Sequence, residues 1–369
     1  MTTWGWRSHY YPLVPFAWAL MAAGHEVRVA TQPSLVPAVT SSGVPAVAVG
    51  PDLDFTEVFR GLANADSDGD ASITADGGTV RYAAAMVDDL VGFGRFWQPD
   101  LVVHEPFNLA GAIAAQVLGV PVVKHLWGAD FTELVPVDES VATGDLVTRF
   151  GLARLREESD LVLDPCPAAI QVPPGRSTRL PMRFVPYNGK AEHPAWLSEP
   201  AEHPRVCVTW GTLMSELDSS ELFLAPKVVD ALSGLDLDIV IATTPDKRPD
   251  FGPLPKNVRF ADAPLALHLV LPSCAAVIHQ GGAGTTMTAM AAGTPQLILP
   301  RIADQLFNAE RLAGTGAGMV GELDTLAAQV GDLTAANRWS EAARLLAAGN
   351  ASRPSPAQVV AELPELIGR

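Results

Sequence analysis

A glycine-rich stretch in the second half of the chain has the residue types and spacing of an anion-binding turn. An apolar run ends at His279-Gln280, three glycines follow at Gly281, Gly282 and Gly284, and a helical pattern begins at Thr285. Glycines let the backbone approach an anion closely, and a helix start offers unpaired N–H groups and a positive dipole end. The spacing matches neither GxxxxGK[ST] nor GxGxxG, which disfavours a P-loop or a standard dinucleotide fingerprint. On these residues alone, a purely structural strand-to-helix turn is an equally good interpretation.

The composition limits the class of protein. The chain has 369 residues, 48% of them apolar, and a formal net charge of −16. Nucleic acids and anionic membranes need a basic footprint, so neither is expected as a partner. The three cysteines are far apart and odd in number, which fits reduced thiols rather than a disulfide framework or a zinc site. With no apolar run of about 18 residues and no signal-peptide features, we expect a cytoplasmic enzyme with no bound metal.

Alternating strand and helix patterns position the glycine turn. The expected strands cover 25–30, 44–49, 101–104 and 122–125 in the first half, and 205–209, 238–242, 258–260, 275–278 and 296–299 in the second. Strands separated by helices indicate parallel sheets covered on both faces. The pattern therefore predicts an α/β protein of two doubly wound, Rossmann-like domains facing across a cleft. The expected boundaries are 1–186, a Pro-rich linker at 187–204, 205–350, and a C-terminal helix at 351–369 that can pack back on the first domain.

Two segments of the first half depart from an ordinary domain of this class. Only Met1 to Trp4 precede the first loop, so the first strand is either very short or the printed start lies inside a longer natural N-terminus, which we favour. Residues Asn64 to Gly78 are rich in Asp, Ala, Ser and Gly and are typical of a surface loop. A solvated connection is the simpler interpretation of this loop, and a lid over a substrate site is the alternative.

The blocks around the glycine turn resemble the GT-B glycosyltransferases of family 1, in particular the actinobacterial enzymes that attach deoxysugars to antibiotics and polyketides. The resembling blocks are Val185 to Gly189, Thr209 to Thr212, Leu254 to Arg259, Ala263 to Leu265, His279 to Thr285, Gly293 to Gln296, and Asp304-Gln305. The resemblance implies metal-independent, cofactor-free, inverting transfer from a TDP- or UDP-sugar to an aromatic or polyketide-type acceptor, O- or C-linked. The chain departs from the family at Asp262 to Leu265, where many relatives carry a Trp near the base.

The resemblance also assigns a donor site to the second domain. His279 and the backbone of the turn hold the diphosphate, Thr212 touches a phosphate from the other side, and Asp304 with Gln305 binds sugar hydroxyls. Carboxylate and amide groups suit hydroxyls because they accept and donate hydrogen bonds. The predicted donor residues are Thr212, His279, Gly281, Gly282, Gly284, Thr285, Asp304 and Gln305.

The first domain would then hold the acceptor and the catalytic base. Transfer to a hydroxyl needs a base, and the resemblance places His9 in that role, since imidazole titrates near neutral pH. Glu105, which follows an expected strand, and Asp130, which resembles a base proposed for C-glycosylating members, are the two candidates for a carboxylate partner. The aromatic residues Trp4, Trp6, Phe107 and Trp127 line the acceptor pocket in one interpretation and belong to the core in the other.

Proteins with two other functions have the same fold. A nucleotide-sugar 2-epimerase binds the same kind of donor but needs no large apolar acceptor site, and a non-catalytic nucleotide-sugar-binding partner would have lost its catalytic residues. The apolar N-terminal residues and the presence of His9, Glu105 and His279 favour the transferase. The resemblance is compatible with a homodimer and with an auxiliary activator protein.

Overall fold

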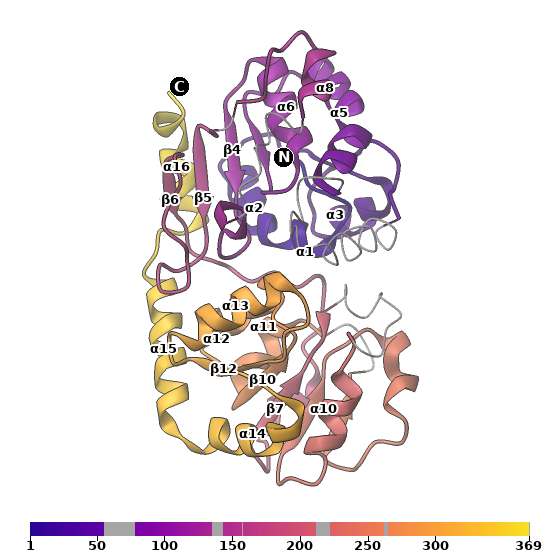
Figure 1. Ribbon diagram of the computed structural model, residues 1–369, viewed down its shortest axis with the longest axis vertical. Helices are drawn as coiled ribbons and strands as arrows, with labels where there is room; N and C mark the ends of the chain where they lie inside the picture. The colour runs from indigo at the N-terminus through magenta and orange to yellow at the C-terminus, as the bar shows by residue number, and fades with distance from the viewer. Residues whose placement is uncertain (55–77, 135–142, 157, 212–221, 262–264, 369) are drawn as a thin grey trace, which may run out of the picture. The chain divides into compact units, whose positions relative to one another are not determined.

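The computed structural model describes residues 1–54, 78–134, 143–156, 158–211, 222–261 and 265–368. Most of the predicted loop at 64–78, Thr212, and residues 262–264 lie outside this range. The chain forms two compact units (Figure 1). Unit 1 comprises Met1–Pro165, Val172–Met182 and Pro354–Arg369, and unit 2 comprises Cys166–Gln171 and Arg183–Arg353. The linker expected at 187–204 therefore belongs to unit 2.

Unit 1 is built on short parallel strands, of which β1, β3 and β5 are buried along their whole length. Its strands are β1 (Val29–Thr31), β2 (Ala46–Ala48), β3 (Val102–His104), β4 (Val122–His125), β5 (Leu161–Asp164) and β6 (Arg179–Pro181). The pairs β1–β2 and β3–β4–β5–β6 are parallel. Thr2 joins the two groups, because it forms parallel bridges to Ala30 on one side and to His104 on the other. The central position of a doubly wound sheet is thus occupied by a single bridging residue.

Helices cover this sheet and carry its core. They are α1 (Arg7–Tyr10), α2 (Val14–Ala22), α3 (Val36–Ser41), α5 (Gly78–Trp97), α6 (Leu109–Leu118), α8 (Gly144–Thr148) and the C-terminal α16 (Pro356–Leu366). Helices α1 and α2 are joined by a 3-10 turn at Tyr11–Leu13 that accommodates Pro12. Helix α16, yellow in Figure 1, belongs to unit 1 and packs against α2.

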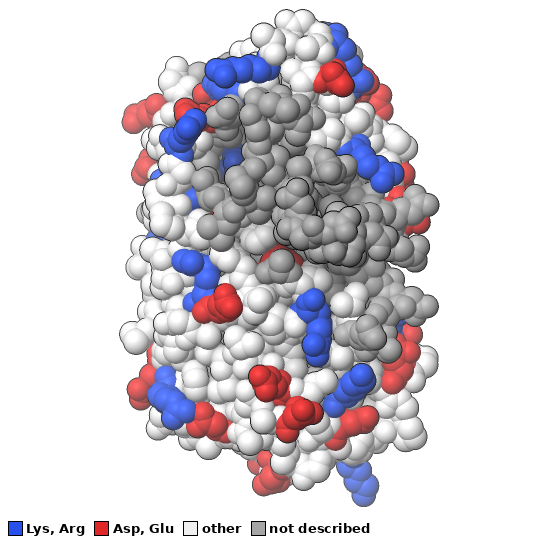
Figure 2. Space-filling view, in the orientation of Figure 1, with Lys and Arg blue, Asp and Glu red and all other residues white. Residues whose placement is uncertain are grey.

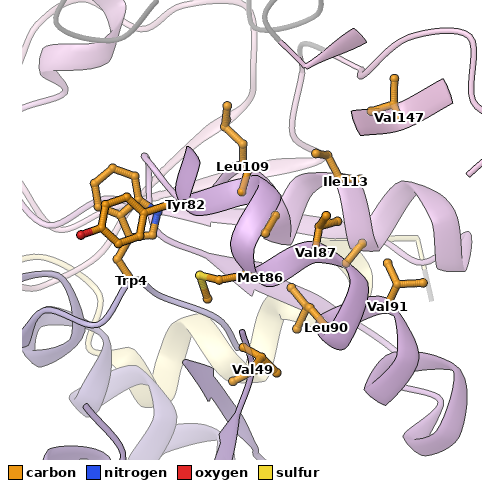
Figure 3. Close-up of a cluster of buried hydrophobic side chains, with 14 of the residues drawn as sticks. Trp4, Val49, Tyr82, Met86, Val87, Leu90, Val91, Leu109, Ile113 and Val147 are labelled. Carbon is orange, nitrogen blue, oxygen red and sulfur yellow. The ribbon is translucent and has the colours of Figure 1, made fainter. Parts of the chain in front are cut away.

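One hydrophobic cluster of unit 1 supports the N-terminal loop. Helix α5 packs along α6, and its apolar face supplies Tyr82, Met86 and Leu90 to the cluster. Trp4 lies at one end of the same cluster, with its ring over the ring of Tyr82 (Figure 3). Residues of the first loop are therefore packed on the core rather than free in solvent.

Unit 2 is a second parallel sheet with the order β12-β11-β10-β7-β8-β9. Its strands are β7 (Arg205–Val208), β8 (Asp238–Ile241), β9 (Val258–Phe260), β10 (Ala276–His279), β11 (Gln296–Ile298) and β12 (Gly318–Val320). In chain order this is 6-5-4-1-2-3, the Rossmann arrangement, whose strand order reverses between β7 and β10. Ligands of such sheets bind outside the carboxyl ends of the strands at this reversal. The glycine turn follows β10 and so lies there.

The helices of unit 2 are α10 (Ala225–Leu232), α11 (Leu267–Val270), α12 (Ala283–Ala292), α13 (Ala303–Ala313), α14 (Leu326–Ala335) and α15 (Asn337–Ala351). Buried Asn350 on α15 makes paired 2.9 Å hydrogen bonds with the backbone N–H and C=O of Phe184. Asn188 accepts hydrogen bonds from the backbone N–H and the ring of His268 and donates one to Thr288. These bonds attach the segment from Phe184 to Asn188 to the helices of unit 2.

The described surface carries both signs of charge. On the face shown in Figure 2, Lys and Arg side chains alternate with Asp and Glu, and the described part of that face has no extended area of one sign. None of the helices within the described ranges is long and apolar enough to cross a membrane.

Candidate active site

His9 and Glu105 lie next to each other in unit 1, where the order of the strands reverses between the segment of Thr2 and β3. His9 lies on α1, just after the bridging segment, and Glu105 directly follows β3, which pairs with that segment through Thr2. His9 is 8% exposed and Glu105 is fully buried. The Nδ1 atom of His9 is 3.2 Å from Oε2 of Glu105, although its N–H direction is poorly aligned with that oxygen. Catalytic contacts of this kind commonly tighten when substrate binds.

Glu105 is held as a carboxylate. Burial alone would raise its pKa, but the pKa is lowered because the facing His9 ring and two N–H donors favour the charged form. The backbone N–H of Phe107 donates to Oε2 at 2.9 Å, and the indole Nε1 of Trp127 donates to the same oxygen at 3.3 Å. A carboxylate at Nδ1 keeps the proton on that nitrogen and leaves the Nε2 lone pair free to accept another. Within the described residues, Nε2 has no hydrogen-bond partner.

The four predicted aromatic residues are gathered around His9. Trp4 stacks on the imidazole with a centroid distance of 5.4 Å and an interplanar angle of 14°, and Trp6 meets it edge-on at 5.0 Å. The rings of Trp127 and Phe107 lie at 5.3 and 6.1 Å from the same imidazole. Trp6, Phe107 and Trp127 are half-buried, whereas Trp4 is only 5% exposed and belongs to the core. Their contact with an acceptor stays a prediction, and the surroundings of Trp4 match the core interpretation.

Tyr82 is a member of this group that the sequence did not reveal. It stacks on the face of Trp4 with a centroid distance of 4.3 Å and an interplanar angle of 18°. Burial raises its pKa, with hydrogen bonding and nearby Arg81 acting in the opposite direction. Tyr82 comes from the amphipathic helix α5, where an aromatic residue at helical spacing indicates only a core position.

Asp130 occupies a different environment. Its carboxylate accepts hydrogen bonds from the hydroxyl of Thr132 at 2.5 Å and from the guanidinium of Arg179 at 3.3 Å. Asp164 at the end of β5 also faces Arg179, at 3.9 Å. This buried ion pair fixes the segment that follows β4, which includes Trp127. The geometry thus gives Glu105, rather than Asp130, the place beside the imidazole.

The glycine turn of unit 2 presents the open start of α12. Gly282 is the N-cap and supplies no side chain to the first N–H groups of the helix, which are therefore available to an anion. Gly281 has φ +103°, and a Cβ there would lie 2.8 Å from both the Gln305 carbonyl oxygen and Ile298 Cγ2. Glycine is thus required by conformation and by space. The backbone from Gly282 to Thr285 is half-buried, so a ligand can reach it.

His279 is engaged on both ring nitrogens. Its Nε2 donates to Gln296 at 2.9 Å, and its Nδ1 accepts the N–H of Gly281 at 3.1 Å. Burial lowers its pKa to about 4, partly offset by the bond to Gln296. A neutral imidazole in this arrangement holds the glycine turn in place. Its predicted direct contact with a diphosphate stays a prediction.

The neighbouring polar residues differ in what they can offer a ligand. Gln305 uses its Oε1 to accept the N–H of Arg301 at 2.9 Å, and Asp304 is half-buried in the first turn of α13. Gln280 was not predicted. It is 6% exposed, its Oε1 has no partner in the described structure, and its Nε2 lies 2.8 Å from where a Cβ of Gly211 would be. Its only sequence signal was its position between the strand and the glycines.

No group of three His, Cys, Asp or Glu side chains suited to a metal ion occurs among the described residues. Residues 18–211 match the N-terminal domain of the erythromycin biosynthesis protein CIII-like family, and residues 226–366 match its C-terminal domain. The chain belongs to this family of glycosyltransferases.

Curated relatives and solved structures agree with this assignment. The chain is 39% identical to an L-demethylnoviosyl transferase of Streptomyces niveus, over 96% of this chain and 94% of the relative. It is 38% identical to a 10-deoxymethynolide desosaminyltransferase of Streptomyces venezuelae, over 86% and 84%. Among solved structures it is similar to the glycosyltransferase VinC in complex with DTDP, with a TM-score of 0.81, 32% identity and full coverage of both chains. The spinosyn rhamnosyltransferase SpnG with thymidine diphosphate gives a TM-score of 0.85 at 28% identity, over 98% of each chain.

The predicted fold and enzyme class are therefore confirmed. The chain is a GT-B glycosyltransferase of family 1, of the type that acts in natural-product biosynthesis, and it depends on a nucleoside-diphosphate sugar. These comparisons do not favour the epimerase or the non-catalytic binding partner.

Proposed function

We propose that this glycosyltransferase moves a deoxysugar from a TDP-sugar to a hydroxyl group of a polyketide-type aglycone, with inversion at the anomeric carbon. The contact between His9 and Glu105 carries the proposal, because it sets an imidazole against a buried carboxylate in an aromatic environment. The names of the relatives support the donor and acceptor classes. Two relatives are named as a 10-deoxymethynolide desosaminyltransferase and an aklavinone 7-beta-L-rhodosaminyltransferase, and two of the similar structures hold thymidine diphosphate.

Each unit contributes one part of the proposed reaction. In unit 1, Nε2 of His9 takes the proton from the acceptor hydroxyl while the oxygen attacks the anomeric carbon, and Glu105 stabilises the imidazolium that forms. The bond from the anomeric carbon to the diphosphate oxygen breaks, and the electron pair leaves with the diphosphate. In unit 2, the N–H groups from Gly282 to Thr285 bind the charge that develops on the leaving group. A single displacement of this kind inverts the anomeric configuration.

Other features of the proposal rest on the same residues. O-transfer is favoured over C-transfer because Asp130 is paired with Arg179 and is not the carboxylate beside the base. We propose TDP over UDP because two of the similar structures hold thymidine diphosphate. We also propose that no metal or other cofactor is needed, since helix N–H groups suit the diphosphate. A cytoplasmic location, a homodimer and an auxiliary activator protein are further proposals, which fractionation, sedimentation and assay of the isolated protein would test.

The direct test is a transfer assay with product identification. The protein is incubated with TDP- and UDP-deoxysugars and a panel of aromatic and macrolide aglycones, with and without EDTA. We expect TDP release coupled to an aglycone whose mass has increased by one sugar, undiminished by EDTA. An isomerised sugar nucleotide without transfer would identify an epimerase. Binding of TDP-sugar with neither release nor isomerisation would identify a non-catalytic binder.

A further inference from the structure

We propose that Trp4 is a positioning residue for the catalytic imidazole rather than part of the acceptor pocket. The inference rests on the proposed role of His9 as general base. Trp4 stacks with two rings, that of Tyr82 at a centroid distance of 4.3 Å and that of His9 at 5.4 Å, with interplanar angles of 18° and 14°. Figure 3 shows the rings of Trp4 and Tyr82, which overlap at one end of the cluster of buried side chains.

The backbone around Trp4 is fixed on both sides. Its carbonyl oxygen accepts the N–H of Trp6 at 2.7 Å and the hydroxyl of Thr31 at 3.3 Å. The next N–H, that of Gly5, donates to Oε1 of Gln32 at 3.0 Å, and Gln32 in turn donates to the Pro51 carbonyl at 2.8 Å. Since Tyr82 stacks on the indole and both rings belong to the same core cluster, the indole cannot tilt without opening the core.

This rigid indole limits the motion of His9. Rotation of the imidazole about its Cβ–Cγ bond would drive the ring into the indole face, so the ring stays in the plane that keeps Nδ1 at Glu105. The same face interacts with positive charge through its π-electrons, which favours the imidazolium that forms as the acceptor loses its proton. Trp4 thus acts on the reaction in two ways without needing to touch the acceptor.

The environment of the indole Nε1 of Trp4 indicates that this residue acts through the face of its ring and not through its N–H group. Its buried Nε1 has no hydrogen-bond partner within the described residues. A buried donor without a partner lowers the stability of the fold, so the N–H group of Trp4 contributes nothing favourable at this position. Phenylalanine would keep an aromatic face toward His9 and remove the unpaired donor. Leucine would keep an apolar side chain and remove the face.

The test compares Trp4→Leu, Trp4→Phe and the control Phe16→Leu, which removes a buried aromatic ring of α2 in the same unit. With the donor and acceptor found in the transfer assay, Trp4→Leu should lower kcat about tenfold, leave KM for the acceptor within twofold and leave Kd for TDP unchanged. Trp4→Phe should recover most of the loss, and Phe16→Leu should keep the wild-type kcat. In a His9→Ala background, Trp4→Leu should change the residual rate less than twofold.

A raised acceptor KM with unchanged kcat in Trp4→Leu would overturn the inference and place Trp4 in the acceptor pocket. An equal tenfold loss in the His9→Ala background would also overturn it.

Nitrogen NMR of histidine-labelled protein gives a readout that needs no substrate, with the His9 signal assigned from His9→Gln. We expect a single tautomer with the proton on Nδ1 in the wild type and in Trp4→Phe, and a mixture in Trp4→Leu. If Trp4→Leu does not fold, an unchanged tautomer and kcat in Tyr82→Leu, which removes the backing ring, would overturn the inference. If the wild type transfers no sugar, the proposed function fails while the NMR comparison still decides the role of Trp4.

Discussion

Replacement of Glu105 by glutamine should separate the charge of the carboxylate from its shape. The substitution keeps the size of the side chain and an oxygen for Phe107 N–H, but removes the negative charge 3.2 Å from His9. At that distance and an effective dielectric constant of about 20, a carboxylate and an imidazolium attract each other by about 5 kcal/mol. The amide dipole recovers part of this, so we expect a loss of about 3–4 kcal/mol of transition-state stabilisation. This corresponds to a fall in kcat of roughly 10²–10³-fold.

The matched control is Asp130→Asn, which removes the other buried carboxylate predicted as a partner of the base. It breaks the ion pair with Arg179, so it should lower the Tm while leaving kcat within about tenfold at a temperature where the variant is folded. The assay is initial-rate transfer at saturating donor and acceptor, with Kd for TDP measured by calorimetry. Glu105→Gln with kcat within threefold of the wild type would refute the reasoning. A loss confined to Asp130→Asn would transfer the role to Asp130.

The remaining predictions concern the donor turn, pH and the core of unit 2. TDP at about a hundred times its Kd should stabilise the protein by about 2.7 kcal/mol and raise the Tm by about 3–4 °C. Gly281→Ala should abolish this shift, and Gly331→Ala, whose Cβ would meet open space, should keep it. The pKa values of buried His104, His125 and His279 are lowered to about 4, so the unfolded chain binds more protons below pH 6.5. The free energy of unfolding should therefore fall by up to about 1.4 kcal/mol per pH unit per histidine between pH 6.5 and 4, and His125→Gln should reduce the slope in urea titrations. Asn350→Ala leaves both backbone groups of Phe184 unpaired and should cost about 2–4 kcal/mol in the same titrations, whereas exposed Asn337→Ala should change stability by less than about 0.5 kcal/mol.

The sequence predicted the features that depend on local pattern. Strands β3, β4 and β10 were identified from apolar runs, with β10 expected at 275–278 and observed at Ala276–His279, and the glycine turn was identified from its composition. The pairing of His9 with Glu105 was predicted from the resemblance to family 1 glycosyltransferases, with Asp130 as the alternative partner, and the structure places Glu105 beside the imidazole.

Contacts between distant side chains were not predictable in the same way. Asp130 and Arg179 come from different strand ends and nothing in their local sequence marks them as a pair. The bond between His279 and Gln296 depends on the register of β10 with β11, and it changes the expected role of the imidazole. Tyr82 reaches the site only through the packing of α5 on the core, which no local pattern specifies.

The most direct test of the central claim is single-turnover transfer by His9→Ala, with TDP binding measured on the same preparation. The account predicts that transfer slows by about 10²–10⁴-fold, as expected for loss of a general base, while Kd for TDP changes less than twofold because the donor turn lies in unit 2. Transfer at the wild-type rate would contradict the assignment of His9 as the base.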